Sequence, residues 1–189
     1  MPSLTKEYLM KNIKGFKDSK NIFRKYAYFV ETGIWKGDTT FAMEKLFQKV
    51  FAIELNKIYL EDVKSRYDGN KIEFLEGKTE ELIGPLSKRL DKRTIFFLDA
   101  HTDKNPPKWL GATNYVPIFE ELKDILKYFK EEAIIIVDDV KLFGINQRGW
   151  KDMNEKNILN IVKERLSDYY YGPSEKHEKD RMFIHLKKL

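Results

Sequence analysis

Two short segments of this chain are apolar at every position, Ile95–Leu98 and Ala133–Val137. A strand with one solvated face alternates apolar and polar residues, whereas a strand covered on both faces is apolar throughout. Acidic residues follow directly after each segment. The pattern predicts two neighbouring strands inside a parallel sheet, with helices on both faces and polar groups at the ends where ligands bind.

The rest of the chain alternates between strand and helix patterns. Three earlier strands are expected at Tyr28–Val30, Val50–Ile53 and Ile72–Leu75. Helices are expected at Thr39–Phe47, Lys57–Tyr67, Glu80–Leu90, Ile118–Tyr128 and around Lys156–Leu166. A closing antiparallel pair is expected at Asp168–Gly172 and Arg181–Leu186, joined by the polar loop Pro173–Asp180. The predicted fold class is therefore α/β, with a doubly wound, mostly parallel, Rossmann-like sheet of seven strands.

Composition narrows the class of protein. A length of 189 residues with 42% hydrophobic content predicts one domain, on whose edge residues 1–26 form a helical cap. The chain has no cysteine, which excludes disulfides, thiolate metal sites and cysteine nucleophiles. The absence of long apolar runs predicts a cytoplasmic protein without a membrane segment. The net charge of +5 comes mostly from lysines scattered among acids, so no stable nucleic-acid partner is expected, although contact of residues 1–26 with RNA or an acidic membrane stays open.

The segment Tyr28–Thr40 joins an expected strand to an expected helix through two glycines. Gly33 and Gly37 allow a sharp turn that can approach a ligand closely, and the polar residues after them can cap the helix. The spacing is not the G-x-G-x-x-G of dinucleotide-binding proteins. Glu31 at the strand end would repel a pyrophosphate and attract a cation. A glycine-bearing turn without any ligand is the alternative.

This E-x-G-x-x-x-G pattern resembles motif I of class I S-adenosylmethionine (SAM) dependent methyltransferases. The resemblance implies SAM as cofactor, bound through residues of the turn: Glu31, Thr32, Gly33, Gly37, Asp38, Thr39 and Thr40. It also implies a ribose contact from Glu54, which follows the second strand at βαβ spacing, because one carboxylate can accept both vicinal hydroxyls. Gly77, Lys78 and Thr79 would lie beside the adenine. An equally weighted alternative is that Thr79 only begins a helix.

Three acids at the ends of the fourth and fifth strands are expected to converge: Asp99, Asp138 and Asp139. Carboxylates placed together repel one another unless a cation lies between them, and oxygen ligands favour Mg²⁺ before Mn²⁺ or Ca²⁺. Residues 28–143 now resemble metal-dependent O-methyltransferases of the catechol and macrocin (macrolide-sugar) type, although Asp139 stands where catechol-type enzymes often have asparagine. The alternatives are that the acids bind only solvent, or that Asp99 contacts SAM without a metal.

Methyl transfer to oxygen requires a base near the metal-side acids. His101 is the preferred general base because it follows Asp99 by two residues and its unperturbed pKa of about 6.5 is close to working pH. Lys104 is the second choice, since a nearby cation would depress its pKa. Trp109, Tyr115 and Phe143 are expected to contact the substrate.

The loop Thr102–Val116 contains Asn105-Pro-Pro-Lys108, which is similar to the N-P-P-aromatic motif of methyltransferases that act on nucleic-acid bases. That motif belongs directly at the strand end, where Asp99 stands, and Lys108 replaces its aromatic residue.

The resemblance to metal-dependent O-methyltransferases implies that the chain methylates a hydroxyl of a sugar, glycan or similar polyol. Nucleic-acid base methylation, a catechol-type acceptor and a non-catalytic SAM-fold subunit are the alternatives, and the oligomeric state stays open.

Overall fold

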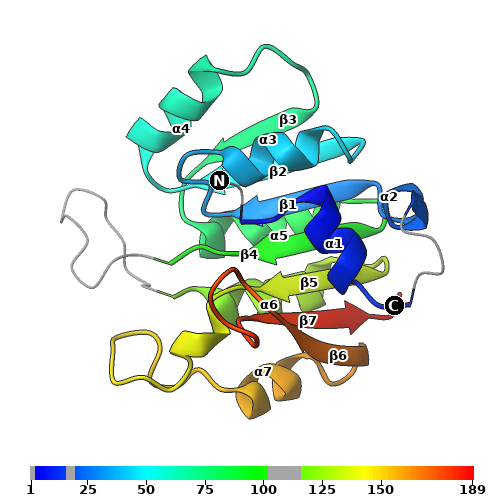
Figure 1. Ribbon diagram of the computed structural model, residues 1–189, viewed down its shortest axis with the longest axis vertical. Helices are drawn as coiled ribbons and strands as arrows, with labels where there is room; N and C mark the ends of the chain where they lie inside the picture. Colours follow the sequence, from blue (N-terminus) through cyan, green and yellow to red (C-terminus); the bar gives the residue numbers. More distant parts are fainter. Residues whose placement is uncertain (1–2, 16–19, 102–115) are drawn as a thin grey trace.

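The computed structural model describes residues 3–15, 20–101 and 116–189, which form a seven-stranded sheet with helices on both faces (Figure 1). The strands are β1 Tyr28–Thr32, β2 Lys49–Glu54, β3 Ile72–Glu76, β4 Thr94–Leu98, β5 Ala133–Val137, β6 Leu166–Gly172 and β7 Arg181–Leu186. Their order is β3-β2-β1-β4-β5-β7-β6. All pairs are parallel except those of β7, which runs antiparallel to β5 and β6. The predicted fold class is confirmed.

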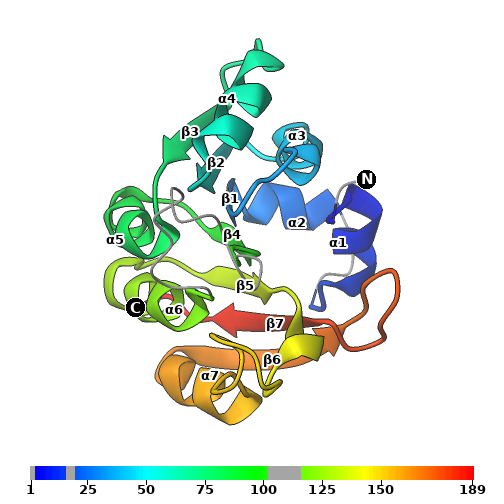
Figure 2. The same ribbon diagram turned by 90° about the vertical axis from the view of Figure 1, so that its left-hand side faces the viewer.

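The helices divide between the two faces of the sheet. They are α1 Lys6–Asn12, α2 Lys20–Lys25, α3 Asp38–Glu44, α4 Lys57–Ser65, α5 Thr79–Arg89, α6 Ile118–Tyr128 and α7 Glu155–Val162, with a short 3-10 helix, η2, at Val140–Leu142. The first four contribute to one hydrophobic core cluster and the last three α-helices to the other. Figure 2 shows α1, α2 and α3 on the side of the sheet opposite α5 and α6. None of the described helices is both long and apolar enough to cross a lipid bilayer.

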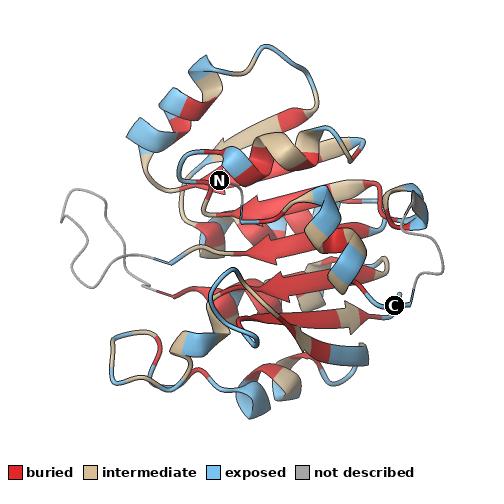
Figure 3. Ribbon diagram, in the orientation of Figure 1, coloured by how far each residue is buried: buried red, intermediate tan, exposed pale blue. Residues whose placement is uncertain are grey.

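The two central strands β4 and β5 are buried at every position, as Figure 3 shows. Alternate residues enter opposite cores: Phe96 lies in the α5–α7 cluster and Phe97 in the α1–α4 cluster. A sheet covered on both faces requires this continuous apolar sequence, because each face buries every second side chain. The apolar patterns of these two segments thus predicted their position correctly.

The register places the carboxyl ends of four strands at one edge. Thr32 at the end of β1 is level with Ile53 of β2 and Leu98 of β4, and Leu98 is level with Val137 of β5. The residues that follow these ends therefore meet at the carboxyl edge of the sheet, which faces the viewer in Figure 2. This edge is where an α/β sheet binds ligands.

Four expected helices end earlier than the sequence predicts: α4 at Ser65 and α5 at Arg89 by one turn or less, and α3 and α7 by more than two residues. Helix α3 ends at Glu44 instead of Phe47, because the chain turns there and carries the Phe47 ring into the core, 5.3 Å from the ring of Phe29. Helix α7 ends at Val162, and Leu166, predicted as helix, begins strand β6. The turn between α7 and β6 is held by Arg165, whose guanidinium donates hydrogen bonds to the carbonyls of Phe129, Glu131 and Lys187.

Candidate active site

The glycine turn after β1 packs directly against the end of β4. Gly33 has a φ of +77°, and a Cβ at this position would lie 2.8 Å from the carbonyl oxygen of Asp99. Gly37, with a φ of +74°, leaves no room for a Cβ beside Val63 of helix α4. Only glycine combines a left-handed backbone with this close approach. Both glycines are therefore required by packing, and the turn they form borders the carboxyl edge.

Glu54 at the end of β2 stabilises this turn through hydrogen bonds to its backbone. Its Oε2 accepts hydrogen bonds from the backbone N–H groups of Ile34 (3.0 Å) and Trp35 (3.1 Å), and its Oε1 accepts one from Asn56 (2.7 Å). The side chain is buried. Each carboxylate oxygen offers two lone pairs, so Oε2 is already satisfied by the two N–H groups and Oε1 retains one lone pair for a ligand hydroxyl.

Glu31 lies on the α3 side of β1 and receives a hydrogen bond of 2.5 Å from the hydroxyl of Thr40. Burial raises the pKa of Glu31 to about 8, although the Thr40 hydroxyl favours the ionised form. Thr39 instead accepts hydrogen bonds from the backbone N–H groups of Ser3 and Leu4, which precede α1. Asp38 is exposed as the first residue of α3. The predicted cofactor residues of this segment thus point in different directions.

The third predicted cofactor segment follows β3. Gly77 has a φ of +145° and donates a backbone hydrogen bond to the carbonyl of Glu54, which joins this turn to the end of β2. Lys78 is the N-cap residue of α5 and forms an ion pair of 3.3 Å with Glu81. Thr79, the first residue of α5, is buried. These residues line the same carboxyl edge beside Glu54.

Asp99 and Asp138 directly follow the neighbouring strands β4 and β5. Asp138 forms a buried ion pair with Arg181, the first residue of β7. The guanidinium contacts both carboxylate oxygens, at 3.1 and 3.3 Å. Burial and the charges of Asp138 and Asp139 raise the pKa of the Asp99 carboxyl well above its usual range. One predicted metal ligand is therefore already paired with a cation of the chain itself.

Asp139 is paired in a similar way. Its Oδ1 lies 2.5 Å from Nζ of Lys141, which also contacts the buried carboxylate of Asp180 at 2.7 Å. Asp139 has a φ of +57°, a left-handed conformation that is uncommon for residues other than glycine. Strained positions of this kind cluster at functional sites. The strain and the lysine together fix the direction of the second Asp139 oxygen.

That second oxygen faces His101. The imidazole Nε2 lies 3.3 Å from Oδ2 of Asp139, and Nδ1 lies 3.8 Å from Oδ1 of Asp99. The ring of the buried Trp150 packs edge-on against the imidazole at a centroid distance of 5.7 Å, and Phe143 lies 6.3 Å from Trp150. The structure thus brings His101 between two acids at the carboxyl edge, next to an aromatic wall. Lys104, Trp109 and Tyr115 lie outside the described residues.

The ligand atoms that approach one another closely enough for a metal differ from the predicted set. Asp99, His101 and Asp139 each offer one atom within 4.8 Å of the others, and so do Asp138, Asp139 and Asp180. Two carboxylates and an imidazole suit a divalent ion such as Mn²⁺ or Mg²⁺. If a metal binds at this edge, the geometry favours His101 over Asp138 as the partner of Asp99 and Asp139.

No protein-family model matches the chain, and no curated protein matches it. Solved structures do match. An S-adenosylmethionine-dependent methyltransferase from Clostridium acetobutylicum has a TM-score of 0.59 and 11% identity, and the match covers 97% of this chain and 90% of that one. An rRNA methylase from Streptococcus thermophilus has a TM-score of 0.53 and 17% identity over 90% and 94%. A putative type 11 methyltransferase from Sulfolobus solfataricus has a TM-score of 0.52 and 20% identity over 89% and 88%.

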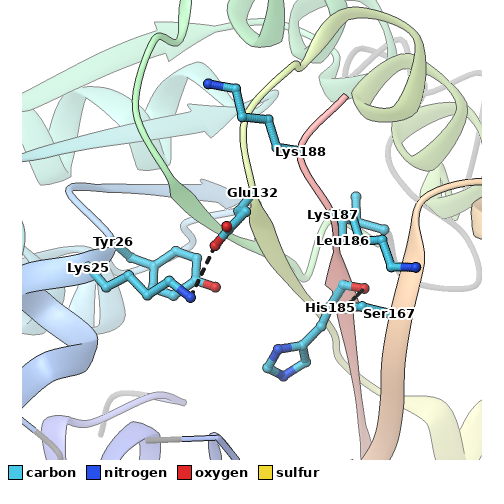
Figure 4. Close-up of a pocket in the computed structure, with 8 residues that line it drawn as sticks. All are labelled: Lys25, Tyr26, Glu132, Ser167, His185, Leu186, Lys187 and Lys188. Atoms are coloured by element: carbon cyan, nitrogen blue, oxygen red, sulfur yellow. Dashed lines mark hydrogen bonds and ion pairs between the residues drawn. The ribbon is translucent and has the colours of Figure 1, made fainter.

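The chain has the class I methyltransferase fold. Identities this low show the fold and nothing finer. In this fold the carboxyl edge carries the predicted site residues that directly follow the strands, including Gly33, Gly77 and Asp99, whereas Thr39 faces the segment before α1. A hollow of about 220 Å³, drawn in Figure 4, lies at the opposite, amino edge, where an ion pair of 3.1 Å joins Lys25 to Glu132. None of the predicted site residues lines that hollow.

Arg181, Lys141 and Asp180 complete the charge network of this methyltransferase fold, and sequence reasoning did not single them out. Arg181 is the first residue of the closing strand β7 and pairs with Asp138, 43 positions earlier, and Asp180 directly before it pairs with Lys141, 39 positions earlier. A signal exists in hindsight: an arginine that begins an otherwise apolar, buried strand needs an anionic partner. The partner cannot be read from the sequence, because the pairing depends on the antiparallel register of β5 and β7.

We expect removal of the Arg181 charge to be strongly destabilising. Arg181→Met leaves Asp138 buried without a partner and should lower the free energy of unfolding by about 3–5 kcal/mol, with part of the loss restored by Asp138→Asn in the same chain. Urea unfolding measures the change. Arg89→Met is the matched control, because Arg89 pairs with Glu73 at the surface and should cost about 1 kcal/mol or less. Equal losses in both variants would contradict the prediction.

Proposed function

We propose that this protein is a SAM-dependent methyltransferase that transfers the methyl group to a hydroxyl of a sugar or similar polyol. The observation that carries the proposal is His101, held between Asp99 and Asp139 at the carboxyl edge of a class I methyltransferase fold. An alcohol is a poor nucleophile until its proton is removed, so a hydroxyl acceptor needs a base at the reacting edge. A nitrogen acceptor that already has a free lone pair needs none.

The residues at the carboxyl edge fit the cofactor. Glu54 is buried and already oriented by three backbone N–H groups, and the remaining lone pair of Oε1 suits a ribose hydroxyl. Glu31 would face the cationic part of the cofactor, where positive charge favours the carboxylate over the neutral acid. The turns at Gly33 and Gly77 bring backbone close to the same position. SAM supplies an electrophilic methyl group when it is bound.

His101 has the geometry of an oriented base. In the tautomer whose Nε2–H donates to Asp139, Nδ1 carries the free lone pair and can accept the proton of the acceptor hydroxyl. Lys141 holds Asp139 in place, and the carboxylate stabilises the imidazolium that forms. Oriented base catalysis contributes about 10²–10⁴ in rate. The resemblance also implies a divalent metal, which would be held by Asp99, His101 and Asp139. Such a metal would acidify the acceptor hydroxyl as a Lewis acid. His101 would then be a metal ligand instead of the base.

Cofactor identity gives the first test of this function. S-adenosylhomocysteine at about a hundred times its dissociation constant should stabilise the fold by about 2.7 kcal/mol and raise the melting temperature. NADH at the same concentration should leave the melting temperature unchanged, because the turn lacks the dinucleotide spacing. Stabilisation by NADH with no effect of S-adenosylhomocysteine at millimolar concentration would end the methyltransferase proposal.

The acceptor class can be tested with SAM labelled in its methyl group. We expect label from a cell extract to enter the glycan or small-polyol fraction, whose hydroxyls are the proposed acceptors. Nuclease treatment of the extract should not change this incorporation, and Glu54→Gln protein is the control for cofactor-dependent labelling. One of the matched structures is named an rRNA methylase; label that enters RNA in preference to every glycan would replace the sugar by a nucleic-acid acceptor.

The role of His101 is tested with the acceptor fraction identified in that way. His101→Ala should lower turnover by about a hundredfold or more, with partial rescue at high pH, where hydroxide replaces the base. Because Arg181 and Lys141 already offset part of the acidic charge, we expect wild-type turnover to persist in EDTA. His177→Ala, at an exposed position in the loop before β7, is the matched control. Loss of turnover in EDTA that Mg²⁺ or Mn²⁺ restores would instead make His101 a metal ligand.

A further inference from the structure

A buried carboxyl group lies beneath the carboxyl edge without a bonding partner. Glu121 of helix α6 is fully buried, and neither of its carboxylate oxygens has a hydrogen bond within the described structure. The hydroxyl oxygens of Thr32 and Thr79 are buried and equally unpartnered, yet both lie near enough to Glu121 to favour its charged form. Buried polar groups are almost always bonded, so three such groups together require an explanation.

The three residues come from three elements that border the proposed cofactor site. Thr32 is the last residue of β1, directly before the turn at Gly33, and Thr79 is the first residue of α5, directly after Lys78. Glu121 lies in the first turn of α6. Along β1, alternate side chains point to opposite faces, so Thr32 faces α5 and α6 while Glu31 faces α3. Any shift of Glu121 therefore acts on two turns of the site.

The carboxyl of Glu121 can link this cluster in either protonation state. Burial raises the pKa of Glu121 to about 7, and the charges of Glu80 on α5 and Glu120 on α6 act in the same direction. A neutral carboxyl both donates and accepts, so it can link the two threonine hydroxyls after small side-chain rotations. An ionised carboxylate can accept a hydrogen bond from each hydroxyl, and the two hydroxyls favour this charged form against the cost of burial.

We propose that Glu121 is a positioning residue of the cofactor site, whose carboxyl ties the end of β1 to the start of α5 through Thr32 and Thr79. This inference rests on the proposed function. A leucine would fill the same volume and remove the cost of burying a polar group. The presence of an acid at position 121 is therefore explained by its role in aligning the two turns, and not by a contribution to the stability of the core.

Binding of S-adenosylhomocysteine, measured by calorimetry at pH 6 and pH 8.5, tests the proposal. Wild type and Glu121→Gln, whose amide keeps a donor and an acceptor for the two hydroxyls, should bind tightly at both pH values. Glu121→Leu should bind about tenfold more weakly at both, which equals the loss of about one hydrogen bond, while it unfolds at the same or a higher temperature. Glu120→Gln removes the same charge from the exposed neighbouring position and should behave as wild type.

The outcomes separate the two proposals. Wild-type protein that binds no S-adenosylhomocysteine at either pH overturns the proposed function, and the role of Glu121 with it. Wild-type binding that is matched by both Glu121 variants at both pH values overturns only the role of Glu121. If the leucine variant does not fold, Thr79→Val still decides, because it removes one of the two hydroxyls with little change of volume, and wild-type affinity in that variant rejects the positioning role.

Discussion

The close approach of Gly33 to the backbone of Asp99 is the constraint on which the rest of the site depends. The absence of a side chain lets the turn after β1 lie against the end of β4, and Glu54 then holds the same turn from the β2 side through two backbone N–H groups. These contacts join the segments that follow β1, β2 and β4 into one continuous edge of the sheet. A site built in this way is positioned by the register of the sheet, which is the most precise feature that the sequence specifies.

The closing hairpin supplies charge as well as a sheet edge. Acids from β4 and β5 accumulate at one point, and their mutual repulsion would be costly without cations. Arg181 at the start of β7 and Lys141 after β5 provide two of these cations from within the chain. The antiparallel direction of β7 makes this possible, since only an antiparallel strand begins at the carboxyl edge of its parallel neighbours.

The sequence predicted the elements that depend on local pattern and missed the contacts that depend on packing. Apolar runs located β4 and β5, and the acids after them located the carboxyl edge. The pairing of Asp138 with Arg181 could not be predicted, because it joins residues 43 positions apart. Glu121 was missed for another reason: an acid in the first turn of a helix is expected at the surface beside the helix dipole, and here α6 packs against α5 and Glu121 lies near Thr32 of β1 and Thr79 of α5.

Two buried acids on opposite faces of β1 give this edge a defined response to pH. The pKa of Glu31 is raised to about 8 and that of Glu121 to about 7, so the folded chain holds protons that the unfolded chain releases above about pH 4.5. Both acids therefore make the fold less stable as the pH rises from 4.5 towards these values, and neither adds a further loss above them. A cation bound beside Glu31 reverses the effect there, because it favours the carboxylate. Glu121 lies on the other face of the sheet, where the hydroxyls of Thr32 and Thr79 favour the carboxylate against the cost of burial.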